Sequence, residues 1–236
     1  MAQLARWIGS LAGATQQPSA KPEFWRIINI DKIDFEEAVK WLRDQVKGLR
    51  ISEGEGFSLV ANGEGTLCAT LTSFKKPVPR HRRWQVDKDF LGITPLCDPQ
   101  DADIDVVAIT GLGGHALGSF RSKEGTSVWL RDFGPRDVPQ ARFITYGYDT
   151  VVAGSDSNQG IAELARMFLD GLVIFRRRTQ TERRPICFVG HSLGGVVLEE
   201  ALVMSSKATD PGNYDLHQIA MATRGLLLMG RPQFRT

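Results

Sequence analysis

The chain is poor in the residue types that mark disulfide scaffolds, metal sites and membrane spans. Its 236 residues include only three cysteines and four histidines. Cys68, Cys97 and Cys187 lack the spacing of metal ligands, so the sequence predicts no metal site and favours a reducing compartment. No run approaches the roughly 18 continuous apolar residues of a membrane span.

An excess of charge of one sign is also missing. The 29 Lys and Arg nearly balance the 27 Asp and Glu, and a net charge of +2 argues neither for nor against a polyanionic partner. Basic residues gather between 75 and 84, but such a run is usually solvated, and we expect no nucleic-acid partner. The hydrophobic share of 42% is enough for a core in one large or two small domains.

The first twenty residues contain no acid. Leu4, Trp7, Ile8 and Leu11 would share one helical face, as in a mitochondrial presequence or an interfacial helix. The simpler interpretation, which we favour, is a disordered tail over residues 1–23.

Residues 24–74 predict a small α+β module in βαββ order. The alternation at 24–30 and the apolar runs at 57–60 and 66–71 indicate strands, and an apolar stripe over Phe35–Val46 indicates a helix. An RNA-binding sheet of this type would carry aromatic residues on its central strands, and the last of these strands has none. We therefore expect a packing or protein-docking role for the module.

Residues 75–102 are interpreted as a basic linker and lead-in, and 103–236 as an α/β domain. In the latter, apolar strands alternate with helical patterns, which predicts a parallel sheet. The expected strands are 106–109, 143–146, 186–189 and 226–229, and the expected helix is 161–175.

Ser192 is the candidate catalytic nucleophile. It lies in a Gly-x-Ser-x-Gly pattern between an apolar strand and a helical pattern, and Gly190 and Gly194 allow the sharp turn that exposes a hydroxyl at the start of a helix. The alternative is a glycine- and serine-containing turn that only links strand to helix. The turn as a whole comprises Gly190, His191, Ser192, Leu193, Gly194 and Gly195.

The glycine loop at 110–115 is the second element of this candidate site. It lacks both the lysine of a P-loop and the glycine register of a dinucleotide site, so the sequence predicts no cofactor. We expect the loop to lie beside the serine turn, where the N–H groups of Leu112 and Leu193 face one oxyanion.

Four segments together resemble the lipase-like α/β-hydrolase domain of the serine active-site-containing protein family, in its fungal type. They are Thr110–His115, Tyr146–Asp149, Gly190–Gly195 and Gly225–Pro232, and the resemblance covers about residues 90–232. It implies a serine esterase or lipase that forms an acyl-Ser192 intermediate on an ester or lipid substrate. It also implies an intracellular protein, either cytoplasmic or in peripheral contact with mitochondrial or endoplasmic reticulum membranes.

Two departures from the family pattern affect this expectation. Thr110 stands where members commonly have histidine, and Gln233 stands where members commonly have the histidine of a Gly-x-Pro-His sequence. Because the triad order in α/β-hydrolases is Ser, Asp or Glu, then His, the interpretation is a partial α/β-hydrolase sheet truncated after the sixth strand. His115 and His191 are expected to have packing or loop roles, and Asp149 and Asp215 to be turn or cap residues.

Two hypotheses on function follow. The first is ester or lipid hydrolysis through Ser192, impaired because the triad acid and base are absent. The second is a non-catalytic interaction or sensor domain of a multidomain protein. In either case Leu226–Met229 is expected to form an apolar edge strand, which a protein partner would cover.

Overall fold

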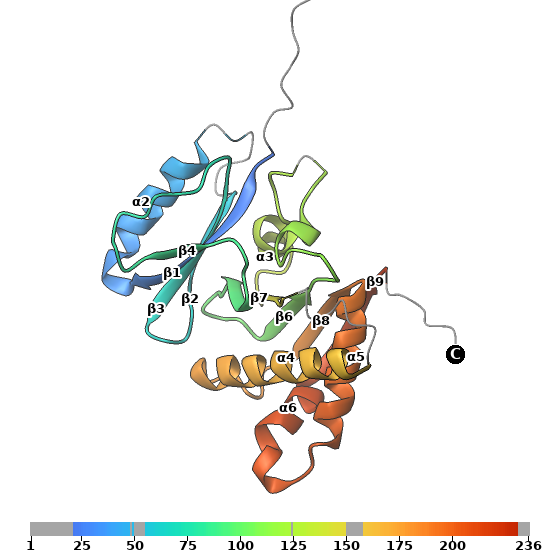
Figure 1. The fold of residues 1–236 in the computed structure, drawn as a ribbon. Helices are drawn as coiled ribbons and strands as arrows, with labels where there is room; N and C mark the ends of the chain where they lie inside the picture. The colour runs from blue at the N-terminus through green and yellow to red at the C-terminus, as the bar shows by residue number, and fades with distance from the viewer. Residues whose placement is uncertain (1–20, 48, 50–54, 124, 150–157, 231–236) are drawn as a thin grey trace, which may run out of the picture.

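The computed structural model describes residues 21–47, 49, 55–123, 125–149 and 158–230. The tail predicted for residues 1–23 therefore lies outside the described residues up to residue 20. Two sheets stand side by side, and helices cover one face of the larger sheet (Figure 1). The division of the chain into separate domains stays a prediction.

The first sheet is antiparallel, with strand order β2-β3-β1-β4. Its strands are β1 (Glu23–Asp31), β2 (Phe57–Ala61), β3 (Thr66–Ser73) and β4 (Gln85–Asp87). Helix α2 (Phe35–Val46) places Trp41 and Leu42 against Ile27, Ile30 and Leu71 of the sheet. The predicted strands and helix of this unit are present, and β4 adds a strand from the segment interpreted as a linker.

The second sheet has five strands in the order β5-β7-β6-β8-β9. They are β5 (Gly92–Cys97), β6 (Ile104–Ile109), β7 (Ala141–Gly147), β8 (Ile186–His191) and β9 (Thr223–Met229). The strands β6 to β9 pair in parallel, whereas β5 runs antiparallel to β7. The predicted α/β class is confirmed, and the expected wholly parallel sheet is corrected to a mixed one.

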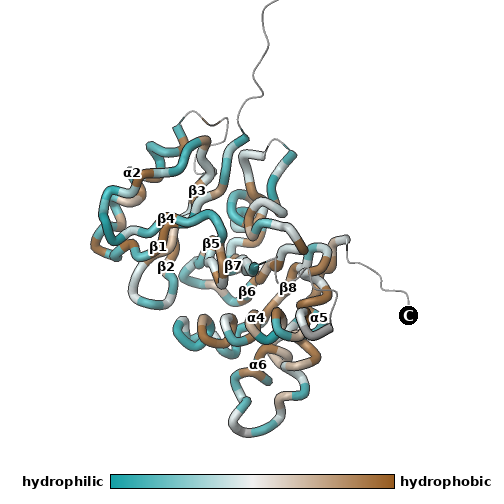
Figure 2. Tube along the Cα trace, viewed as in Figure 1, coloured by the Kyte–Doolittle hydropathy of each residue, from teal (hydrophilic) through white to brown (hydrophobic). Residues whose placement is uncertain are grey.

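The larger sheet is buried on both faces by different kinds of structure. One face packs against α4 (Asn158–Arg178), α5 (Leu193–Lys207) and α6 (Tyr214–Ala222). Phe188 on that face contacts the helices, while Val189 on the other face joins a cluster with Phe24 and Phe90. The strands in the middle of the sheet are accordingly apolar (Figure 2). Short helical turns, among them Trp129–Phe133 and α3 (Gly134–Asp137), help to cover the second face together with Phe24 of β1 and Phe90.

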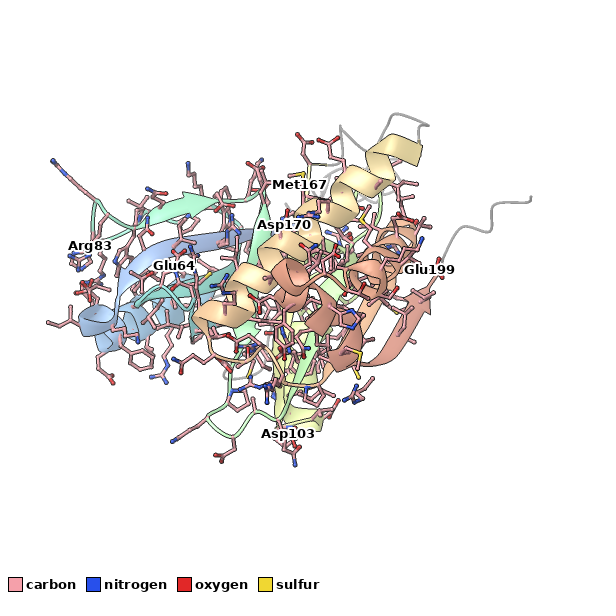
Figure 3. All side chains as sticks on the ribbon, turned by 90° about the horizontal axis from the view of Figure 1, so that it is seen from below. Glu64, Arg83, Asp103, Met167, Asp170 and Glu199 are labelled. Atoms are coloured by element: carbon pink, nitrogen blue, oxygen red, sulfur yellow. The ribbon has the colours of Figure 1, made fainter. Side chains whose placement is uncertain are left out.

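A buried ion cluster fixes α4 to the start of the parallel strands. Asp105 accepts two hydrogen bonds of 2.8 Å from Arg142, and it is also paired with Arg176 of α4. All three side chains are almost fully buried. The outer side of α4 is exposed, as Met167 and Asp170 show (Figure 3).

Strand β9 lies at the edge of the described sheet, as expected. Leu226 is 39% exposed and Leu227 54% exposed. A run of apolar residues that is typical of a strand buried on both faces is therefore open to solvent on part of its surface.

Candidate functional site

The order of the strands reverses between β6 and β8. From β6 the chain passes to β7 on one side, and from β7 it returns through α4 to β8 on the other side. In open α/β sheets, ligands bind outside the carboxyl ends of the strands at such a reversal of order. The loop after β6 and the turn after β8, which the sequence singled out, meet there.

Ser192 occupies a strained turn between β8 and α5. Its backbone has φ 53° and ψ −127°, a combination that few non-glycine residues adopt. Its N–H donates to the carbonyl of Met229 at 2.8 Å, and the N–H of Gly195 donates to its carbonyl at 3.0 Å. The predicted strand, sharp turn and helix are therefore present, and Ser192 is the residue that carries the strain.

The flanking glycines allow backbone segments to approach more closely than other residues would permit. A Cβ on Gly190 would lie 2.7 Å from the Cα of Gly195, and a Cβ on Gly194 would lie 2.4 Å from the carbonyl oxygen of Thr110. Neither distance is compatible with a side chain unless the backbone moves. The pattern thus reflects packing of α5 on β6 and β8 as well as exposure of the serine.

The glycine loop lies directly against Ser192. A Cβ on Gly111 would come within 2.7 Å of the Ser192 Cβ and 3.2 Å of its Oγ. Leu112 follows, with an exposed side chain. The loop and the serine turn are therefore in contact, while the roles of Leu112 and Leu193 N–H as oxyanion donors stay a prediction.

Tyr148 and Ser119 hold the glycine loop, and the sequence marked neither of them as a site residue. The buried Tyr148 hydroxyl donates to the carbonyl of Thr110 at 2.9 Å, and the side-chain hydroxyls of Thr110 and Ser119 are hydrogen-bonded to each other. Burial raises the pKa of Tyr148 to about 12, so its hydroxyl remains a donor. The sequence signals for Tyr148 were its place after an apolar strand and within the Tyr146–Asp149 segment of the family resemblance.

None of the four histidines is hydrogen-bonded to Ser192. His191 is half-buried beside Phe120, and its Nδ1 has no partner among the described residues. His217 lies in helix α6, and its Nδ1 is 3.3 Å from the Ser205 carbonyl oxygen. His81 pairs with Glu37 at 3.2 Å in the first sheet's unit.

His115 is also committed elsewhere. Its Nε2 lies 2.8 Å from the carbonyl oxygen of Lys88, and its Nδ1 accepts from two backbone N–H groups, those of Leu117 and Gly118. Both ring nitrogens are therefore engaged with the backbone. The expected loop or packing role agrees with this geometry, which leaves no lone pair to accept the serine proton.

A cavity of about 770 Å³ borders the glycine loop. Gly113 and Gly114 line it together with Phe24, Leu91 and Tyr148, whereas Ser192 is not part of its wall. The cavity has the size of a small-molecule site.

One group of side chains in the described residues has the composition of a metal site, away from the serine turn. The ligand atoms of Asp34, Glu37 and His81 lie within 4.8 Å of one another. Arginine already neutralises them, since Arg83 pairs with Asp34 and Arg80 lies 3.6 Å from Glu37. The hydrogen bond from Arg83 lowers the pKa of Asp34. These contacts account for the cluster as an ion-pair network.

The fold and the serine turn define a mixed α/β domain with the strand–turn–helix of Gly-x-Ser-x-Gly proteins. The chain is similar to Protein SERAC1 of Bos taurus, with 24% identity over 149 residues, which is 56% of this chain and 22% of that protein. Protein SERAC1 of Danio rerio is 25% identical over 155 residues, 58% of this chain and 23% of the relative. The match thus spans less than a quarter of these relatives and indicates a distant relationship.

Two further observations bear on the class of protein. No protein-family model matches the chain. Among the residues that the structure covers, no helix is both long and apolar enough to cross a membrane. The hydrolase-like relation therefore rests on the distant similarity and the α/β fold, and the fungal type stays a prediction.

Proposed function

We propose that this is a serine-hydrolase-type domain in which Ser192 attacks the carbonyl carbon of an ester. The observation that carries the proposal is the strained backbone of Ser192 at the start of α5, in contact with Gly111. Strain at a non-glycine residue persists where the surrounding structure imposes it, and such positions cluster at functional sites.

The chemistry assigned to this geometry is acyl transfer. The Ser192 oxygen forms a bond to the carbonyl carbon, a base takes the hydroxyl proton, and the ester's alcohol leaves with a proton. The N–H groups of Leu112 and Leu193, with the positive end of the α5 dipole, stabilise the oxyanion. Water then hydrolyses acyl-Ser192.

None of the four histidines is placed to act as the base in this mechanism. Without a positioned base a serine hydroxyl is a weak nucleophile, and oxyanion stabilisation alone leaves roughly a thousandfold over water or less. We therefore propose near-background turnover for these 236 residues. The choice of an ester or lipid substrate, and peripheral contact with mitochondrial or endoplasmic reticulum membranes, rest on the family resemblance.

A fluorophosphonate probe tests this function, because it reacts with nucleophilic serines. We expect slow labelling of the wild type that Ser192→Ala abolishes. Ser206→Ala is the control, since Ser206 is an exposed serine on the same helix whose hydroxyl bonds only the Val203 carbonyl. Labelling that survives in Ser192→Ala would assign the nucleophile to another residue.

The second candidate function is an interaction domain, and the exposed edge strand favours it. β9 pairs only with β8 in the described sheet, and its exposed Leu226 and Leu227 lie on that edge. An unpaired apolar edge is a template for strand addition. We propose that a protein partner covers it, with ester hydrolysis absent in that case. Efficient, Ser192-dependent ester turnover by the purified chain would exclude this candidate.

A further inference from the structure

The imidazole of His115 is held in one protonation state by what surrounds it. Nδ1 faces two N–H donors, those of Leu117 at 3.1 Å and Gly118 at 3.0 Å, so it must be an unprotonated acceptor. Nε2 lies 2.8 Å from a carbonyl oxygen, that of Lys88, so it must carry the hydrogen. The ring is therefore the neutral Nε2–H tautomer.

Aromatic packing fixes the plane of this ring. The His115 ring centroid lies 5.0 Å from that of Phe90, edge to face, and 5.7 Å from that of Phe24. A Cβ on Gly118 would lie 3.2 Å from the His115 Cβ, so the following turn also closes over the histidine. The side chain has little room to adopt another rotamer.

The ring joins the glycine loop to a segment fixed by the first sheet. Arg26 of β1 donates to Asp87 at 2.9 Å and to the Leu91 carbonyl at 2.9 Å. Asp87 in turn accepts from the N–H of Phe90 at 2.9 Å. Lys88 lies within this braced segment, so the Nε2–H bond of His115 anchors the end of the glycine loop to a rigid support.

We infer that His115 is a positioning residue, which as a neutral imidazole holds the 110–114 loop in the shape that presents the Leu112 N–H to Ser192. This inference rests on the proposed function of Ser192. His115 then shapes the oxyanion site and does not act as the base.

A protonated ring would not fit this environment. The imidazolium would direct a second N–H at the two backbone donors, and the bonds to Leu117 and Gly118 would be lost. Burial lowers the pKa of His115 below its ordinary 6.5. The charged groups around it act in both directions, because Asp87 and Asp89 raise the pKa and Arg121 lowers it, and Glu23 and Asp149 line the adjoining cavity.

The stability that neutral His115 contributes to the fold depends on pH. The folded state binds the proton less tightly than the unfolded state, so the unfolded state carries more protons as the pH falls below 6.5. The stability that neutral His115 contributes is present above pH 6.5 and is lost as the pH falls through that value toward the folded-state pKa. In the folded protein the ring itself gains a proton only as the pH falls through this lowered pKa, and the loop should loosen there.

The test measures the fluorophosphonate labelling rate of Ser192 between about pH 5 and 8 in the 236-residue chain. His115→Phe keeps a ring of similar size and removes both sets of bonds. His115→Asn keeps an oxygen that can replace Nδ1. His81→Asn is the control, because His81 contacts Glu37 in the first sheet's unit.

We expect His115→Phe to lower the labelling rate at pH 7.5 by about tenfold or more, since loss of one oxyanion donor costs about 10²–10³-fold in catalysis. His115→Asn should recover part of this loss. Its labelling rate should also lack the extra decrease that protonation of His115 causes in the wild type at acidic pH. His81→Asn should behave as the wild type. A wild-type rate and pH profile in His115→Phe would overturn the inference.

A second measurement separates this inference from the proposed function. If Ser192 of the wild type is never labelled, the proposed nucleophile fails, and the ¹⁵N chemical shifts of the His115 ring still decide the role of the histidine. An unprotonated Nδ1 with faster amide exchange at Leu117 and Gly118 in His115→Phe supports the anchor. A protonated Nδ1 at pH 7.5 overturns it.

Discussion

The packing of Gly194 offers a test of the site's architecture that does not depend on catalysis. An alanine Cβ at this position would lie 2.4 Å from the carbonyl oxygen of Thr110 and 2.7 Å from that of Ile109. Ordinary contacts begin near 3.4 Å, so the first turn of α5 and the end of β6 would have to separate by about 1 Å. Both neighbours are backbone atoms, which cannot rotate away.

The expected cost is set by two opposing effects. Overpacking a close-packed interior costs about 1–3 kcal/mol, whereas glycine-to-alanine in a helix gains up to about 1 kcal/mol. We expect Gly194→Ala to lose about 2 kcal/mol net. For a chain of this length that lowers Tm by roughly 4–8 °C.

Gly171→Ala is the matched control for the thermal unfolding assay. Gly171 lies within α4, and a Cβ there would have only ordinary contacts of 3.9 Å with Ile93 and Tyr146. This variant should unfold at or above the wild-type temperature in circular dichroism. If Gly194→Ala were as stable as Gly171→Ala, the close approach of α5 to β6 would be wrong.

Three further predictions concern strain, buried charge and the open edge. Ser192→Gly should be more stable than Ser192→Ala by about 1 kcal/mol in urea, because glycine relieves strain of about 1–3 kcal/mol and gives back about 0.4–1 kcal/mol through the unfolded chain; equal stability would mean that the turn is unstrained. Asp105→Asn should cost about 3–5 kcal/mol in the same assay, since it leaves the buried Arg176 without its carboxylate and leaves Arg142 with only Asp98, at 4.0 Å; a loss under about 1 kcal/mol would contradict this. Leu227→Lys should reduce self-association in light scattering, and a wild-type monomer that this change leaves unaltered would show that the edge is already protected.

The sequence predicted the elements whose patterns are strictly local. Helix α2 begins and ends at Phe35 and Val46 as expected, and the predicted strand 186–189 lies within β8. The serine turn was predictable because glycine spacing, an apolar strand and a helical pattern all indicate the same structure. These signals reside in neighbouring residues, so no distant contact was needed to interpret them.

Elements that depend on distant partners were missed. Strand β5 contains Pro95, which weakens a strand pattern, and its pairing with β7 is made across some fifty residues of chain. Helix α6 was not among the predicted elements. The engagement of His115 was not predictable either, because its Nε2 bonds a carbonyl 27 residues away.

The most direct test of the central claim is a crystal structure of the chain after reaction with a fluorophosphonate. The phosphorus should be bonded to the Ser192 oxygen. Its free oxygen should lie about 2.7–3.1 Å from the backbone nitrogens of both Leu112 and Leu193, the range for an oxyanion donor. A phosphonate on another residue, or one on Ser192 whose oxygen points away from both amides, would contradict the account.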